Sequence, residues 1–188
     1  MKTAHNISID FIGIWNERQY GPMDYTIQLR QALDMAGHAD TKIVLPDGYV
    51  SQTLVQQLNS NKTFSDAVYA LGTHSCSAAP TWQGDSDSFQ QRWWCTELEV
   101  HNGWGGGAGW AEYLSTNFVK ANQTSTTSWS LIWSTPIALS PYQNCGAMMA
   151  HEPWSGHYTV DAAIWMHAHW TQFTEIGWRM LAVESGSS

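Results

Sequence analysis

Residues 9–17 read IDFIGIWNE, an apolar run that ends in a carboxylate. A short apolar run with β-branched and aromatic residues predicts a buried strand, which here covers residues 9–14. Working outward along the chain, runs with the same character recur at 42–45 (KIVL), 67–71 (AVYAL), 92–96 (RWWCT) and 127–133 (TSWSLIW). The sequence therefore predicts a series of short strands.

Helical patterns separate these runs. Apolar residues recur with helical spacing from Asp24 to Ala36, and Gly37 follows as a stop signal. Ser51 is placed to cap a short helix, and residues 110–120 are helical again. Strands that alternate with helices predict an α/β fold with a parallel sheet built from βαβ units.

Composition excludes several classes of protein. The 188 residues are 43% hydrophobic with a net charge of −8, which predicts a folded chain and disfavours nucleic-acid binding. Apolar runs fall well short of the ~20 residues that a membrane helix needs, and residues 1–14 lack the features of a signal peptide. Because the three cysteines leave one unpaired, we expect no disulfide framework, and the absence of a CxxC pair disfavours structural zinc.

Two glutamates stand where strands are expected to end. Glu17 follows the first run and Glu97 follows RWWCT. Taken alone, Glu17 also fits a helix start or an ion pair with Arg18, and Glu97 fits the ordinary polar end of an apolar strand. Together they are eighty positions and three strand-to-strand steps apart, or about 27 residues per step, close to one unit of a (β/α)8 barrel. Three steps place the two carboxylates on facing walls of one pocket.

Facing carboxylates are the groups that glycoside hydrolysis requires. One protonates the leaving oxygen, and the other attacks the anomeric carbon when the carboxyl groups are ~5–5.5 Å apart. Asn16, beside Glu17, suits a hydrogen bond to a sugar hydroxyl. The chain also has 12 Trp, whose flat apolar rings suit the faces of sugars.

Several longer motifs carry a family resemblance. They are IDFIGIWNERQY, RWWCTELE, TSTTSWSLIW and HEPWSGHY, followed by TQFT and GW at 171–174 and 177–178. From about Ile9 to Leu181 the chain resembles the galactocerebrosidases, family fifty-nine of the glycoside hydrolases. The resemblance implies a (β/α)8 barrel and retaining hydrolysis of β-galactosides of ceramide. It also implies a saposin-type lipid-presenting partner and a lysosomal or secreted location.

Matching motifs carry roles onto residues of this chain. The resemblance implies that Glu17 is the general acid/base, that Glu97 is the nucleophile and that Asn16 contacts the sugar. His74 in LGTH, Trp129 in TSWS and Tyr142 in SPYQ match pocket positions. We expect no cofactor and no metal. For the chemistry we expect Glu17 to be buried against Trp15 and protonated, while hydrogen bonds keep Glu97 ionised.

Three departures from the family pattern stand out. Leu98 follows the nucleophile where the family has an acidic residue, and Glu99 comes one position later. Gly109 replaces a family cysteine, so the disulfide that the resemblance implies there cannot form. The loop at 74–91 also differs. Loop changes of this kind are expected to alter the preference for the aglycone and to spare the chemistry.

The resemblance also implies an order of domains. If residues 9–14 form the fourth barrel strand, residues 1–140 hold about strands 4 to 8, and residues 141–188 are a post-barrel segment that leads into a β-rich domain. Strands one to three are then absent, and the chain reads as a fragment of an enzyme. An open half-barrel would have two unpaired sheet edges.

The sequence also fits other functions. A related barrel glycosidase would act on soluble galactosides, and an inactive remnant would only bind sugar. Residues 103–108 fit the G-x-G-x-x-A dinucleotide pattern, but the preceding strand ends in Glu97, whose charge would repel a pyrophosphate. His151-Glu152 lacks the HExxH spacing. His167 and His169 are expected to share one face of a strand, and two ligands make a weak metal site.

Overall fold

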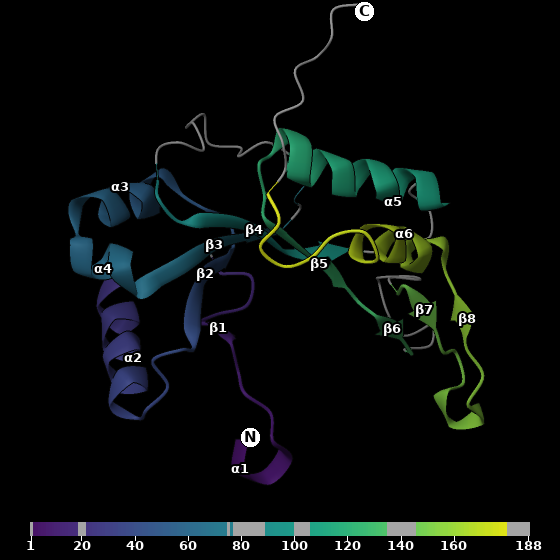
Figure 1. Cartoon of the computed structure of the whole chain (residues 1–188), viewed down its shortest axis with the longest axis horizontal. Coiled ribbons are helices and arrows are strands. Elements are labelled where there is room, and N and C mark those ends of the chain that lie inside the picture. The colour runs from purple at the N-terminus through teal and green to yellow at the C-terminus, as the bar shows by residue number, and fades with distance from the viewer. Residues whose placement is uncertain are drawn as a thin grey trace, which may run out of the picture. The chain divides into compact units, whose positions relative to one another are not determined.

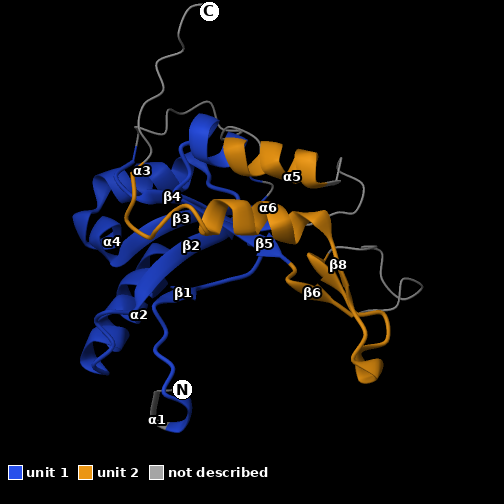
Figure 2. Cartoon of the chain, turned by 45° about the vertical axis from the view of Figure 1, so that its right-hand side comes forward, with its two compact units in different colours: residues 1–99, 116–129 blue, residues 100–115, 130–188 orange. Residues whose placement is uncertain are grey.

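The structure is a computed structural model that describes residues 2–18, 22–74, 76, 89–99, 106–134 and 146–179. The chain divides into two compact units (Figure 2). Unit 1 holds residues 1–99 and 116–129, and unit 2 holds residues 100–115 and 130–188. The domain boundary expected after residue 140 lies outside the described residues. Among the described residues, every helix is too short or too polar to cross a membrane.

Unit 1 is built on a five-stranded parallel sheet that curls into a half-barrel (Figure 1). The order β1-β2-β3-β4-β5 follows the chain, and every pairing is parallel. The strands are β1 (Phe11–Gly13), β2 (Lys42–Gly48), β3 (Val68–His74), β4 (Arg92–Glu99) and β5 (Ser125–Trp129). This confirms the expected parallel α/β sheet, because sequential parallel strands are what βαβ units produce.

One short helix precedes β1, and others connect the strands of unit 1. They are α1 (Lys2–His5), α2 (Met23–Met35), α3 (Gln52–Ser60), α4 (Lys62–Ala67) and the π-helix η2 (Thr116–Lys120). Helix α3 begins as predicted, because the Ser51 hydroxyl accepts a hydrogen bond from the Leu54 amide at 3.2 Å. Asn61 caps α4 in the same way through the Phe64 amide.

The core of unit 1 lies between the sheet and helices α2, α3 and α4. Its buried members are Ile43, Leu45, Val50, Leu54, Val55, Leu58, Phe64, Val68, Leu71, Phe89 and Trp93. Phe11 of β1, Tyr69 of β3 and Trp94 of β4 form an aromatic cluster, with ring centroids 4.8–5.7 Å apart. Since successive side chains of a strand point to opposite faces, this cluster lies on the face away from the helices. Both faces of the sheet therefore carry apolar side chains.

Unit 2 pairs two helices and adds a small sheet. Its strands β6 (Ile132–Trp133), β7 (Met148–Met149) and β8 (Thr159–Val160) lie side by side in that order. A short 3-10 turn, η4 (Pro153–Ser155), precedes β8. Helices α5 (Gly106–Ser115) and α6 (Ala162–Thr171) approach so closely that a Cβ on Gly107 would lie 3.3 Å from Ala162 Cβ. The sequence predicted one strand at residues 127–133, whereas the structure has two strands there, β5 and β6.

The expectation for His167 and His169 is wrong, because both lie on helix α6 and not on a strand. Two positions along a helix are about 200° apart around its axis, so the two rings do not share a face. His167 instead packs its ring 5.2 Å from that of Trp110. Burial lowers the pKa of His167. It is therefore a packed side chain between two helices of unit 2.

Candidate active site

Four ionisable side chains of unit 1 converge at the carboxyl ends of its parallel strands. Glu17 follows β1, Asp47 lies near the end of β2, His74 ends β3, and Glu97 lies near the end of β4. The carboxyl edge of a parallel sheet is where α/β folds bind ligands, because the connecting loops open there. The four side chains thus come from four neighbouring strands.

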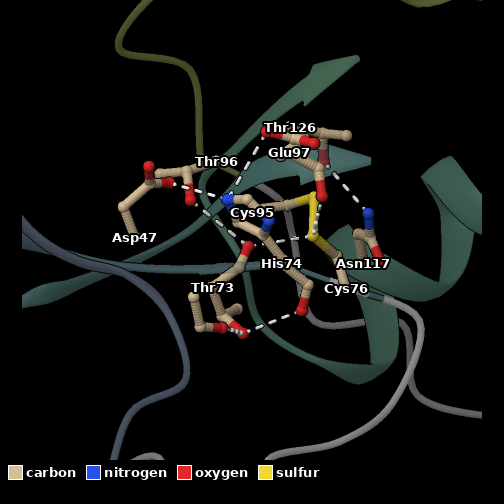
Figure 3. The surroundings of a disulfide bond; sticks show 10 residues. Asp47, Thr73, His74, Cys76, Cys95, Thr96, Glu97, Asn117 and Thr126 are labelled. Carbon is tan, nitrogen blue, oxygen red and sulfur yellow. Dashed lines mark hydrogen bonds and ion pairs between the residues drawn. A yellow bond between two sulfur atoms is a disulfide. The ribbon is translucent and has the colours of Figure 1, made fainter. Parts of the chain in front are cut away.

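His74 lies at the centre of this group. Its Nε2 lies 3.0 Å from Asp47 Oδ1, which is hydrogen-bond distance, and 3.6 Å from Glu97 Oε2 (Figure 3). Its Nδ1 lies 3.5 Å from Glu17 Oε1. One imidazole therefore faces three carboxylates, and the two longer contacts are electrostatic. Only 14% of the His74 side chain is exposed.

The structure brings the two predicted glutamates close together. One carboxylate oxygen of Glu17, one of Glu97 and a ring nitrogen of His74 all lie within 4.8 Å of one another. Such a pair fits the short carboxyl separation of retaining glycosidases better than the ~6.5–9.5 Å of inverting ones. An acid pair with an imidazole is also a donor set that a divalent cation can use.

The backbone places two of these acids in an uncommon conformation. Glu17 has φ 53° and Asp47 has φ 60°, both in the left-handed region that non-glycine residues rarely adopt. The next residue of β2, Gly48, lies so near Glu17 that a Cβ there would be 3.5 Å from the Glu17 main chain. Uncommon backbone at functional residues aims side chains that regular strands would point elsewhere.

The two glutamates differ in burial, and the expectation that Glu17 is the buried one is wrong. Glu17 is 66% exposed and Trp15 is 52% exposed, so Glu17 is not buried against Trp15. Glu97 is the more buried of the two, and its burial raises the pKa of its carboxyl group. The His74 ring lowers that pKa, whereas the charges of Glu17, Asp47 and Glu99 raise it.

A bulge between β3 and β4 sets the direction of His74 and Glu97. Thr73 pairs with Cys95 and His74 pairs with Glu97, so Thr96 is an extra residue on β4. Its side chain lies over Gly72, where an added Cβ would come within 2.4 Å of Thr96 Cγ2. Glycine at position 72 therefore makes room for the bulge beside the site.

The expectation of no disulfide is wrong, because Cys76 and Cys95 are bonded (Figure 3). An odd cysteine count leaves one cysteine over, but it does not prevent two from pairing when the fold brings them together. The Cα atoms of these two lie 5.3 Å apart, within the range for disulfides. Cys145, the third, lies outside the described residues.

The other predicted site residues have varied positions. Asn16 is exposed next to Glu17, and the partly buried Trp129 ends β5, aligned with Glu99 of β4. Tyr142 and residues 103–105 of the G-x-G-x-x-A pattern lie outside the described residues. Sequence reasoning missed Asp47, which it treated only as part of the turn Pro46-Asp47-Gly48. The rule that found Glu17 and Glu97, a carboxylate at a strand end, applies to Asp47 as well.

A curled parallel α/β sheet with paired glutamates at its carboxyl edge is the arrangement on which barrel glycosidases rely. Sequence comparison agrees with this class. The chain belongs to glycosyl hydrolase family 59, whose sequence model matches residues 1–172.

Curated relatives of the chain are similar over nearly all of its length. It is 38% identical to galactocerebrosidase of Danio rerio over 177 residues, which covers 94% of the chain. It is 36% identical to galactocerebrosidase of Homo sapiens over 184 residues, covering 96% of the chain. The chain spans about a quarter, 26%, of the length of these relatives.

Solved structures share the fold. SrfJ from Salmonella typhimurium superposes with a TM-score of 0.68 at 13% identity, covering 91% of this chain and 44% of that one. The endo-beta1,6-glucanase BT3312 superposes with a TM-score of 0.63 at 12% identity, covering 98% of this chain and 49% of that one. At these identities the likeness concerns the fold alone.

Proposed function

We propose that the protein to which this chain belongs is a retaining glycoside hydrolase that removes β-linked galactose from galactosylceramide or related glycolipids. The observation that carries the proposal is the approach of Glu17 and Glu97, whose nearest carboxylate oxygens lie within 4.8 Å. Membership of family 59 and the similarity to galactocerebrosidases support the galactosyl substrate.

The proposed reaction is a double displacement. In the first step a Glu97 oxygen attacks the anomeric carbon, the bond to the leaving oxygen breaks, and the Glu17 carboxyl gives its proton to that oxygen. In the second step the Glu17 carboxylate takes a proton from water. The water oxygen attacks the anomeric carbon, and the carboxylate of Glu97 is released. The sugar keeps its β configuration.

The assignment of the two roles rests on the family resemblance. The burial seen here favours the protonated form of Glu97, which by itself is the property of an acid. The neighbouring His74 ring opposes this effect and favours the carboxylate that a nucleophile needs. We therefore assign His74 the role of holding Glu97 ionised, and Asp47 the role of orienting the His74 ring.

The remaining assignments follow from the same resemblance. Asn16 would contact the sugar, and Trp129 and Tyr142 would line the pocket. Strands β1 to β5 would be strands 4 to 8 of an eight-stranded barrel, followed by the start of a β-rich domain. A saposin-type protein would present the lipid. The Cys76–Cys95 disulfide fits an oxidising compartment, which supports a lysosomal or secreted location.

Hydrolysis by the full-length protein tests this proposal. Galactosylceramide in detergent and soluble β-galactosides are supplied side by side, and proton NMR follows the anomer that is released first. We expect turnover of galactosylceramide with β-galactose as the first product. First release of α-galactose would reject the double displacement. Turnover of soluble galactosides alone would identify the alternative substrate class, and sugar binding without turnover would identify an inactive remnant.

A further inference from the structure

The Cys76–Cys95 disulfide is buried directly beneath the candidate site. Cys76 is 1% exposed and Cys95 is fully buried. Cys76 comes two residues after His74, and Cys95 comes two residues before Glu97. The bond therefore joins the two strand ends that carry the central imidazole and the proposed nucleophile.

Contacts of the sulfur atoms strengthen this connection. Cys76 Sγ lies 3.2 Å from the carbonyl oxygen of Thr73 and 3.5 Å from that of Glu97 (Figure 3). A disulfide sulfur carries no proton, so these are packing contacts and not hydrogen bonds. The sulfur thus packs against the main chain of both strands, next to His74 on one and at Glu97 itself on the other.

The bond crosses the sheet where its ladder is interrupted. The register between β3 and β4 shifts between Thr73 and His74, because Thr96 is inserted on β4. A bulge disrupts the regular backbone hydrogen bonds of a strand pair. A covalent link at this point restrains the ends of β3 and β4 where their regular backbone hydrogen bonds are disrupted.

Charge supplies a reason for such a restraint. Three carboxylates face one imidazole, and the charges of Glu17 and Asp47 disfavour ionisation of Glu97. Like charges in one site repel, and Glu97 would relieve the repulsion by moving away with the end of β4. The contact of 3.6 Å between His74 and Glu97 would then lengthen.

We propose that the Cys76–Cys95 disulfide positions Glu97 against His74 by fixing the carboxyl ends of β3 and β4 across the bulge. Cys76 and Cys95 are positioning residues that act through this pair. The expected effect of the disulfide on turnover rests on the proposed function. Its effect on the ends of β3 and β4 can be measured without any turnover.

The first test uses the full-length protein without any substrate. A non-reduced digest should contain one linked peptide with Cys76 and Cys95. In the variant Cys76→Ala/Cys95→Ala, amide hydrogen exchange at residues 72–74 and 96–98 should rise, with exchange at residues 11–13 and 42–44 unchanged. Cys145→Ser, which removes the cysteine outside this bond, should change neither segment. A missing linked peptide, or unchanged exchange at both strand ends, would overturn the inference.

The second test separates positioning from general stability. At a temperature well below unfolding, the double cysteine variant should lose about 10- to 100-fold in kcat with KM within about twofold, as expected for a small misplacement of a reacting group. In a His74→Gln background, the same two substitutions should cost less than about twofold more, because they act through His74. An equal loss in both backgrounds, or wild-type kcat, would overturn the inference. If the unmodified protein hydrolyses no galactoside, the proposed function fails, and the exchange result alone decides the inference.

Discussion

Glu17 and Glu97 are eighty positions apart in the sequence, yet one carboxylate oxygen of each lies within 4.8 Å of the other. His74 lies between them, with Nδ1 facing Glu17 and Nε2 facing Glu97. Because four successive parallel strands bring these groups to one edge, the pairing is a direct product of the sheet order.

Replacing Glu17 with Gln tests its role as the acid/base. The variant has no proton to give, so galactosides whose leaving oxygen is a basic alcohol should lose about 10²- to 10⁴-fold in kcat. Aryl galactosides with an acidic leaving phenol should lose less in the first step, and added azide should restore turnover and yield β-galactosyl azide. Glu112→Gln, at an exposed position on α5, serves as the control and should keep full activity. Equal losses for both kinds of leaving group would contradict this role.

Two substitutions should move the pH profile in opposite directions. The nucleophile must be ionised, so the acid limb of kcat/KM follows the pKa of Glu97. The charge of Glu99 raises that pKa, so Glu99→Gln lowers it and extends activity to lower pH. The His74 ring lowers the same pKa, so His74→Gln raises it and moves the acid limb to higher pH. Profiles of the two variants that shift in the same direction would rule out this electrostatic account.

Asp47 should matter for turnover although it does not touch the proposed reacting atoms. Its Oδ1 is 3.0 Å from His74 Nε2, and a hydrogen bond to a charged group contributes about 1.5–3 kcal/mol. Asp47→Asn should therefore lower kcat by about 10- to 100-fold and leave KM nearly unchanged. Asp66→Asn removes a carboxylate that pairs with Lys62 on the surface of α4, and it should have no effect. Steady-state kinetics with both variants would measure the difference, and similar rates would exclude the orienting role.

Gly72 should be needed for the bulge that aims His74 and Glu97. An added Cβ would come within 2.4 Å of Thr96 Cγ2, so Gly72→Ala should lower stability by about 1–3 kcal/mol, the usual cost of overpacking. Thermal unfolding should show a lower Tm for this variant. The double variant Gly72→Ala/Thr96→Ala, which lacks the Thr96 side chain beyond Cβ, should recover most of the lost stability. No recovery in the double variant would mean that the strain lies elsewhere.

The strands and the glutamate pair could be predicted from the sequence because each depends on local pattern. Buried parallel strands are short apolar runs, such as residues 42–45, and their regular spacing places Glu17 and Glu97 at one edge. Helix α6 could not be predicted in the same way. Its sequence, AAIWMHAHWT, is apolar on all sides and carries no 3.6-residue period.

Other features depend on distances that no local pattern contains. The disulfide requires the ends of β3 and β4 to meet, and the sequence shows only that Cys76 and Cys95 are 19 positions apart. Asp47 follows a proline and precedes a glycine, a pattern typical of turns, so the sequence did not indicate that Asp47 lies near a strand end. The burial of Glu97 rather than Glu17 is likewise a result of packing around the sheet edge.

The most direct test of the two-carboxylate mechanism is the identity of the glutamate that bonds to the sugar. The full-length protein is treated with a 2-fluoro-galactosyl fluoride, which slows release of the sugar from the enzyme, and peptide mass spectrometry locates the label. We expect one 2-fluoro-galactosyl group on Glu97, and none in the Glu97→Ala variant, which should also lose turnover. Labelling of Glu17, or labelling that persists in Glu97→Ala, would contradict this mechanism.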